Sequence, residues 1–496
     1  MRRVRGRLGP NLNWQIIVPV VSWALLAVGL GLAVCFVVAV VGEGAVIAFG
    51  APAAVVLPLA LVGVASGRRL RSMPLRARDG FAAVTVAWIV AAAAGAVPFL
   101  LHGTFAQPVD AFFESMSGFT TTGATLLDRI EDEPDAVLLW RSLTQWLGGV
   151  GIVVLVVAIA PATGLATQRV FYAETSGITA ERLTPRIADT AKIIWGIYLT
   201  LTALGFGAYW LAGMTPWDAI NHIFTSVATG GFSTRTASIG GFESLPIELV
   251  AITFMVAGGI NFGFYWTALR GRERLWPQAA EVRAYLLILL GASTVVTASL
   301  LLADEGAGVG GSIRASAFSV VTVVTGTGYT TADFDEWPAF TRLTLLGLMF
   351  VGGCAGSTAG GMKVIRIMLL GKAAVQEVQR QLQPKAMQVL RVRGRVFSEE
   401  VRRGVFAFLA IYLAVFFVGT LVMATFGLDP VTAASSVAAT LNVVGPGLGD
   451  VGASENFTAV PDGGRWVLSA LMLVGRLEVF TVLVLLTPAF WRPNIA

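Results

Sequence analysis

Apolar stretches of about 20 residues recur along almost the whole chain, and they constrain its fold more than any other feature. Each is long enough to cross the hydrocarbon core of a bilayer as an α-helix. Hydrophobic residues fill 55% of the 496 positions and charged residues only 13%, far below the quarter that is usual in soluble domains. The sequence therefore predicts an all-α membrane protein that crosses the bilayer many times. We place its spans at 14–41, 46–66, 81–102, 137–160, 190–213, 246–269, 282–303, 340–370, 403–426 and 464–490.

The basic residues predict how these spans are oriented. If the N-terminus is cytoplasmic, 28 of the 35 Lys and Arg residues fall in connections on the inner side. Cytoplasmic loops of membrane proteins carry this excess, so both termini are predicted to be cytoplasmic. One chain that carries all the spans is typical of transport proteins of the bacterial inner (cytoplasmic) membrane. The predicted inner segments are 1–14, 67–80, 161–192, 270–283, 363–403 and the C-terminal tail.

The acidic residues show the opposite bias. Twenty of the 30 Asp and Glu residues lie in or near the predicted outer segments, among them Glu131, Asp333 and Asp335. An outer surface with this charge concentrates cations and repels anions. For any single acid, an ordinary solvated loop charge explains its position equally well. Only the collective bias indicates a cation pathway.

Four segments on the outer side do not fit a simple up-and-down pattern. Each has a moderately apolar stretch of about ten residues, too short to span, followed by glycine with Thr, Ser or Asn. In three of them an Asp (Asp110, Asp218, Asp429) is placed to cap a helix N-terminus. We expect a half-helix and an irregular loop in each. The segments are 108–125, 216–233, 312–330 and 429–449.

The four segments define an internal repeat. Their candidate glycines are Gly123, Gly231, Gly328 and Gly445, about 100 residues apart, a period that predicts four copies of one helix, half-helix, loop and helix unit. Two helices precede the first copy. The predicted regions are 1–80 for the N-terminal helix pair, then 81–189, 190–281, 282–401 and 402–496 for the four repeats.

Irregular backbone at membrane depth is tolerated only where protein buries it or water lines it. Four half-helices entering from outside would direct their partially negative C-terminal ends toward the membrane centre. The loops beyond them would present rings of backbone carbonyls that replace a cation's hydration shell. Neutral carbonyls suit a monovalent cation, whereas Ca²⁺ sites usually recruit carboxylates. A single Gly-Thr cluster often only packs helices closely, but four in register on one side favour a pore.

A gate is predicted in the span 340–370. Residues 351–361 contain five glycines, each costing a helix about 1 kcal/mol relative to Ala. We expect a broken helix whose loop lies across the pore below the filter and moves. The alternative is that small residues let helices approach. The candidate gating residues are Gly352, Gly353, Gly356, Ser357, Gly360 and Gly361.

Arg476 is a charge near the centre of the last apolar run, where a charged side chain usually faces a cavity or a polar partner. Two interpretations carry equal weight. Arg476 has a functional role in a cavity, or it is a buried charge satisfied by loop carbonyls for structural reasons only.

The loops DAFFESMSGFTTTGAT, SVATGGFST, VVTGTGYTT and LNVVGPGLG resemble the four filter loops of the Trk/Ktr/HKT superfamily of K⁺ transporters. RSLTQWLGGVGIVVL, GLMFVGGCAGSTAGGMKVIR and GRLEVFTVLVL resemble its TrkH branch, as does the extra N-terminal helix pair. The resemblance implies a pseudo-fourfold pore, a homodimer, an intramembrane gating loop and a cytosolic nucleotide-binding partner of the TrkA type. It also places Arg476 near the pore below the filter, where its functional role would be an electrostatic barrier that tunes K⁺ flux and helps to hold the gating loop. It also implies a filter formed by Thr121, Thr122, Gly123, Thr229, Gly230, Gly231, Thr325, Gly326, Thr327, Gly328, Asn442, Val443, Val444 and Gly445.

The resemblance also bears on the choice of ion. A serine at the first filter glycine accompanies Na⁺ preference in some HKT relatives, and Gly123 at that position favours K⁺. In the fourth loop Pro446 departs from the family pattern and leaves the register open between Gly445 and Gly447. A Na⁺-conducting or unselective relative is the alternative, and the same residues fit a channel and an H⁺- or Na⁺-coupled symporter.

Other function classes fit less well. A transporter of organic solutes usually has inverted repeats with two broken helices, and an intramembrane enzyme needs a nucleophile with its base or a metal cluster. The sequence shows no such set, no nucleotide-binding loop and no zinc-like cysteine spacing. We expect no enzymatic activity, no bound cofactor and no nucleic-acid partner, only the transported K⁺, the lipid bilayer and the protein partners implied above.

Overall fold

The computed structural model describes residues 12–42, 44–67, 77–159, 187–269, 276–303, 308–382, 391–392 and 395–491, and they are almost entirely helical. The predicted inner segments 1–14, 67–80 and 161–192 lie largely outside these residues, as do residues 270–275 of the segment 270–283. The helices of the N-terminal pair and the first two repeats are α1 (Trp14–Val41), α2 (Val46–Gly67), α3 (Ala77–His102), α4 (Pro108–Phe119), α5 (Asp135–Ile159), α7 (Ile187–Leu211), α8 (Pro216–Val227), α9 (Leu245–Gly258) and α10 (Phe262–Leu269).

The last two repeats complete the chain. Their helices are α11 (Trp276–Leu302), α12 (Gly308–Thr325), α13 (Ala339–Met349), α14 (Val364–Leu382), α15 (Glu399–Thr425), α16 (Pro430–Leu441), α17 (Asp462–Arg476), α18 (Phe480–Leu486) and α19 (Pro488–Trp491). Two short strands, β1 (Arg391–Val392) and β2 (Arg395–Val396), pair antiparallel within the basic segment that precedes α15.

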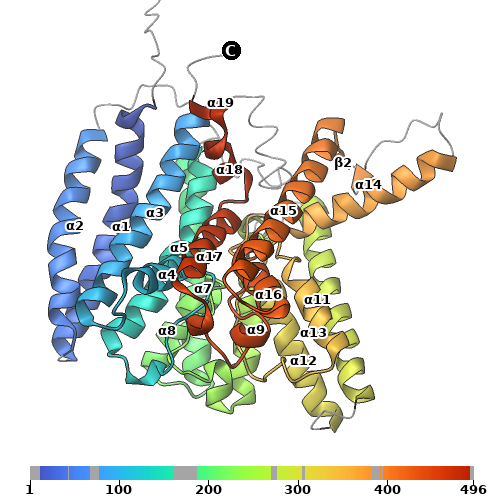
Figure 1. Ribbon diagram of the computed structural model, residues 1–496, viewed down its shortest axis with the longest axis horizontal. Helices are drawn as coiled ribbons and strands as arrows, with labels where there is room; N and C mark the ends of the chain where they lie inside the picture. Colours follow the sequence, from blue (N-terminus) through green and yellow to red (C-terminus); the bar gives the residue numbers. More distant parts are fainter. Residues whose placement is uncertain are drawn as a thin grey trace, which may run out of the picture.

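Among the described residues, seven helices have the length and composition expected of a bilayer-crossing helix. Each of two bent helix pairs adds one more span if the pair is counted together. The predicted all-α polytopic membrane fold is therefore confirmed. In Figure 1, α1, α2 and α3 stand side by side at one end of the molecule, and α14 projects from the other.

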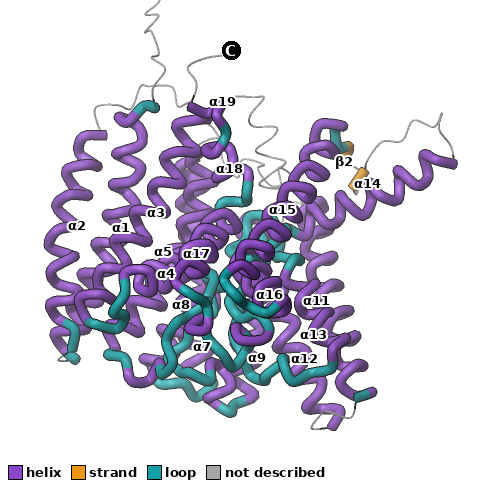
Figure 2. Tube along the Cα trace, viewed as in Figure 1, coloured by secondary structure: helices purple, strands orange, loops and turns teal. Residues whose placement is uncertain are grey.

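The four repeats close into a circle through their short helices. The second helix of each repeat packs on the short helix of the next: α5 on α8, α9 on α12, and α13 on α16. The last repeat returns to the first, because α17 packs on α4. Figure 2 shows that loop segments gather in the middle of the molecule, beside α4, α16 and α17. This arrangement brings loops from distant parts of the sequence together.

Two of the predicted continuous spans are wrong. The span 246–269 is divided into α9 and α10, which meet at 90°, and the span 464–490 is divided into α17 and α18, which meet at 119°. The sequence pattern missed these breaks because each interrupts a long apolar run at only three residues, 259–261 and 477–479, which include Asn261 and Glu478. The predicted break in the third repeat is correct, since α13 ends at Met349 and α14 begins at Val364.

The short helices differ from the prediction in two further details. Three of them have 12 residues, but α12 has 18, so the expectation of a stretch too short to span is wrong for the third repeat. Asp429 is an N-cap, accepting from the Val431 and Thr432 N–H groups. Asp110 and Asp218 are not caps but lie in the first turn. Proline at the first helical position starts α4 and α8 earlier.

The contact between α5 and α4 gives a test of the packing. A Cβ on Gly148 would overlap the carbonyl oxygen of Phe119, the last residue of α4, whereas a Cβ on Gly196 in α7 would meet nothing within 4 Å. We expect Gly148→Ala to lower the free energy of unfolding by about 1–3 kcal/mol through overpacking. Gly196→Ala should leave it unchanged or raise it by up to about 1 kcal/mol. Thermal unfolding in detergent measures both, and equal stability of the two variants would contradict this packing.

Candidate functional site: a closed ring of four loops

The loops after the four short helices share one backbone conformation. Each has a glycine with φ between +80° and +101°. The residue two positions before it also has positive φ, although three of these four residues are not glycines. Such φ values are uncommon outside glycine and persist where the surroundings fix them. The glycines are Gly123, Gly231, Gly328 and Gly445, and the preceding residues are Thr121, Thr229, Gly326 and Val443.

The same glycines close the loops into a ring. A Cβ added to any of them would lie less than 3.0 Å from a carbonyl oxygen of another loop. These contacts run around the ring in sequence order: Gly123 to Gly230, Gly231 to Thr327, Gly328 to Val444, and Gly445 back to Thr122. All four glycines also line one cavity of about 80 Å³. The ring therefore has no room for a side chain at these positions.

The geometry resolves the register of the fourth loop. Gly445 has a φ of +101° and faces the Thr122 carbonyl, as the other ring glycines face theirs. Gly447 is outside the left-handed region, and a Cβ there would meet the side chains of Val451 and Ser435 instead. Gly445 is thus the fourth member of the ring.

The side chains of the ring loops are buried, and most of them are already hydrogen-bonded within the protein. The hydroxyl oxygens of Thr325 and Thr327 lie 2.7 Å apart, and those of Thr120 and Thr122 lie 2.8 Å apart. Asn442 accepts a hydrogen bond from Tyr412, at 2.5 Å. Backbone carbonyls are therefore the main oxygen atoms left to face a ligand in the ring.

The electrostatics of the ring favour a cation. The C-terminal, partially negative ends of α4, α8, α12 and α16 lead directly into the loops. Residues 121–123, 229–231, 326–328 and 443–445 of the ring include no Asp or Glu. Among the described residues, no group of three or more His, Cys, Asp or Glu could hold a metal ion. Neutral carbonyls under a weak negative field suit a monovalent cation better than Ca²⁺ or Mg²⁺.

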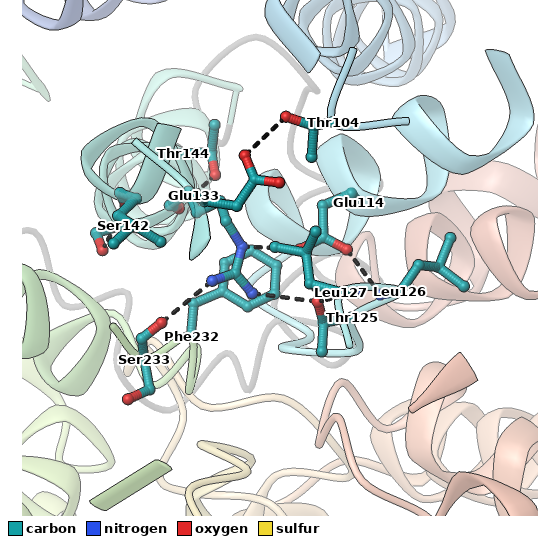
Figure 3. Close-up of polar contacts among 12 residues, drawn as sticks. Thr104, Glu114, Thr125, Leu126, Leu127, Glu133, Ser142, Thr144, Phe232 and Ser233 are labelled. Carbon is teal, nitrogen blue, oxygen red and sulfur yellow. Dashed lines mark hydrogen bonds and ion pairs between the residues drawn. The ribbon is translucent and has the colours of Figure 1, made fainter. Parts of the chain in front are cut away.

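A buried ion pair joins the first loop to the second. Arg141 of α5 lies 2.9 Å from Glu114 of α4, and both are at most 1% exposed. The Arg141 guanidinium also donates to the Ser233 carbonyl, and the Glu114 carboxylate accepts from the Leu126 N–H. Figure 3 shows Glu114, Thr125 and Ser233 converging on this centre from separate segments. The pair therefore connects the chain that leaves both loops.

The other three repeat boundaries have their own polar links. These are Arg314 with Glu248 at 2.6 Å, the Asp335 carboxylate with the Gly449 N–H at 2.7 Å, and Arg465 with Asp110. Sequence analysis placed these residues on the outer side but did not pair them. The sequence did hold one signal for these links, because several of these residues lie in or next to the short helices rather than in the longer loops.

Acidic residues also gather outside the ring. Asp333, Asp335, Glu336, Asp450 and Glu455 are among the residues that line an outer cavity of about 420 Å³. The cavity lies between the third and fourth repeats, which supply these acids.

Besides Glu114, the carboxylate of Glu131 also links the first repeat to the second. Glu131 accepts hydrogen bonds from the N–H and the hydroxyl of Thr236. Partial burial acts to raise the pKa of the Glu131 carboxyl, but the hydrogen bonds from Thr236 and the charge of Arg235 bring that pKa below its ordinary value. Glu131 is therefore ionised at neutral pH.

The loop between α13 and α14 holds every predicted gating glycine and Ser357. It folds back on itself, because the Gly352 N–H donates to the Met362 carbonyl at 2.9 Å. It also docks on the break between α9 and α10, where the Cys354 N–H donates to the Gly259 carbonyl at 2.8 Å. A Cβ on Gly360 would overlap the Asn442 carbonyl. The loop thus packs directly against the fourth ring segment.

Two charged residues of other helices, Arg476 of α17 and Glu281 of α11, hold this loop. Arg476, only 4% exposed, donates to the carbonyls of Thr358 at 2.7 Å and Gly148 at 3.2 Å. The Glu281 carboxylate accepts from the N–H groups of Ala355 at 2.8 Å and Ile365 at 3.2 Å. The carbonyl partners of Arg476 fit both interpretations of that residue. Glu281 was missed because it lies near a predicted inner connection, where a solvated charge is expected.

Comparison with known proteins identifies the family. The TrkH family model, described as a cation transport protein, matches residues 53–492.

The chain belongs to the TrkH family.

Among its curated relatives, the Trk system potassium uptake protein TrkH of Vibrio parahaemolyticus is 42% identical over 423 residues, 84% of this chain and 87% of the relative. TrkH of Halomonas elongata is 44% identical over 422 residues, with the same coverage. The crystal structure of the potassium transporter TrkH from Vibrio parahaemolyticus superposes with a TM-score of 0.88 at 38% identity, covering 97% of this chain and 100% of that one. The predicted TrkH resemblance is confirmed.

The buried ion pair of this TrkH-family chain can be tested directly. Arg141→Met leaves the Glu114 charge buried without its partner, and we expect it to lower the free energy of unfolding by about 3–5 kcal/mol. Adding Glu114→Gln to the same chain should recover much of this loss. Arg380→Met, which breaks an exposed pair with Glu377, should cost less than about 1 kcal/mol. Thermal unfolding of all three variants measures these losses. Equal losses of unfolding free energy in Arg141→Met and in the double variant would contradict the pairing.

Proposed function

We propose that this chain takes up K⁺ across the bacterial cytoplasmic membrane through a pseudo-fourfold pore in which the ring of four loops is the selectivity filter. The observation that carries the proposal is the closed ring itself, with four glycines of like conformation each facing a carbonyl of another loop. Both compared TrkH relatives are named potassium uptake proteins, which supports K⁺ as the ion.

The ring would select by exchanging water for carbonyl oxygens. A cation entering from outside leaves its hydration shell, and rings of backbone carbonyls take the place of the lost water. The acidic outer cavity raises the local cation concentration. The buried ion pair and the other interrepeat links keep the oxygens at fixed distances. Gly123 rather than serine in the first loop supports K⁺ over Na⁺ by family resemblance.

The loop between α13 and α14 would be the gate. It packs against the fourth ring segment and accepts a hydrogen bond from Arg476. Opening would move it off the α9–α10 break. In this proposal Arg476 holds the closed loop and adds a positive barrier beside the pathway.

The proposal includes protein partners. A homodimer and a cytosolic nucleotide-binding subunit of the TrkA type are supported by family membership and by the Trk system names of the relatives. The basic segment 372–403 would dock such a subunit, and contact with anionic lipid is the alternative. With both termini cytoplasmic, the acidic outer cavity would face outward.

Cation flux into liposomes tests the filter. Gly231→Ala places a Cβ against the Thr327 carbonyl at a φ of +83°, whereas Gly213→Ala has a φ of +109° in open space. We expect Gly231→Ala to reduce K⁺ flux by roughly tenfold or more, because strain at such a φ is of order 1–3 kcal/mol before the overlap is counted. Gly213→Ala should keep its flux.

The ion comparison uses the same liposomes. Rb⁺ and K⁺ flux well above Na⁺ flux supports the K⁺ filter, and equal Na⁺ flux would replace it with the Na⁺-conducting or unselective alternative. Absence of all cation flux, even with the cytosolic subunit added, would contradict the pore.

The gate has a separate test. Arg476→Ala removes the hydrogen bond to the Thr358 carbonyl, so we expect K⁺ flux without the cytosolic subunit to increase several-fold. Arg403→Ala, an exposed change in α15, is the control and should leave that flux unchanged. If Arg476 is purely structural, its replacement lowers the unfolding temperature without raising flux in the protein that remains folded.

A further inference from the structure

The segment RSLTQWLGGVG in α5 contains a residue that the proposed function leaves unexplained. Gln145 follows Arg141 by one helical turn, so both lie on the same face of α5. Its side chain is completely buried. A buried amide needs partners for both its donor and its acceptor, so its surroundings reveal what it holds.

Both partners of Gln145 belong to the second ring loop. Its Nε2 donates to the Gly230 carbonyl at 2.6 Å, and its Oε1 accepts from the Phe232 N–H at 3.0 Å. The amide therefore bridges the two residues on either side of Gly231, the ring glycine. Only one orientation of the amide satisfies both contacts, because a carbonyl accepts and an N–H donates.

Gln145 also explains why this loop has a second glycine. The other loops have Thr122, Thr327 or Val444 where the second has Gly230. The backbone does not require glycine there, because Gly230 is not among the residues with positive φ. A Cβ on Gly230 would instead lie within 3.0 Å of the Gln145 amide atoms. The Gln145 amide, which comes from the first repeat, therefore occupies the space that a side chain at position 230 would fill.

We propose that Gln145 is a positioning residue that fixes the second ring segment and thereby sets the discrimination between K⁺ and Na⁺. This rests on the proposed filter. The hydrogen bond to Gly230 limits where that carbonyl points, and the bond from Phe232 limits how Gly231 rotates. Without them the second segment moves inward around a smaller cation. Gln145 itself does not contact the ion.

The test is Gln145→Glu measured as the ratio of K⁺ flux to Na⁺ flux in liposomes. The ionised carboxylate has nearly the same shape as the amide and still accepts from the Phe232 N–H, but it cannot donate to the Gly230 carbonyl. Fluxes are measured at alkaline pH, because a buried carboxyl that stays protonated would donate to that carbonyl. We expect the flux ratio to fall by about fivefold to tenfold, the equivalent of one hydrogen bond. Ser142→Ala is the matched control, since that buried hydroxyl donates only within α5, to the Leu138 carbonyl.

A second set of variants covers the case in which Gln145→Glu does not fold. Gly230→Thr alone should abolish flux, because its side chain overlaps the Gln145 amide. Gly230→Thr combined with Gln145→Ala gives the second loop the side chain seen in the first and third, and should recover K⁺ flux. Failure of the double variant to exceed the Gly230→Thr variant would contradict the shared space.

These outcomes separate the inference from the proposed filter. If the unaltered protein selects K⁺ and the folded Gln145→Glu variant selects it equally well, Gln145 has no positioning role and the filter stands. If the unaltered protein does not select K⁺, the proposed filter fails first. A lower flux ratio at unchanged unfolding temperature supports both, because a purely structural role would change stability without changing the ratio.

Discussion

The structure depends on one constraint, that no backbone N–H or C=O group inside a bilayer can rely on water for a hydrogen bond. Helices meet it internally, but this chain places loops and helix breaks among its spans. The loops find partners in the short helices that precede them. The Thr122 N–H donates to the Ser117 carbonyl at 2.8 Å, and the Thr327 N–H donates to the Thr322 carbonyl at 2.9 Å. Irregular backbone is thus confined to places where other protein segments supply partners.

The same constraint links the gating loop to the second repeat. Where α9 ends, the carbonyls of Gly258 and Gly259 lose their helical partners, and the N–H groups of Thr358 and Cys354 take that place. The break and the loop therefore satisfy each other, and neither is stable in this form alone. In the proposed gate, movement of the loop would have to expose these groups to water or to new partners.

The four repeats share a pattern but differ in rigidity. The second helix is continuous in the first repeat, where α5 carries Arg141 and Gln145 against two ring loops. In the other three repeats the second helix is broken, and all three breaks border the gating loop or Arg476. Buried ionic and amide contacts hold the ring, whereas backbone hydrogen bonds and two charged side chains hold the loop. This division supports the proposal of a fixed filter and a movable gate.

The sequence by itself determined the helical membrane fold, the positions of the four glycine loops and the broken helix between Met349 and Val364. These features follow from local hydrophobicity, segment length and the conformational needs of glycine, all of which can be read along one chain. Only the tertiary structure decided the breaks after Gly258 and Arg476, the place of Gly445 in the ring, and the contacts of Gln145 and Glu281. Each of these depends on a partner 60 or more residues away, and each break interrupts its apolar run at only three residues. Pairing across such distances is set by packing in three dimensions, which leaves no periodic signal in the sequence.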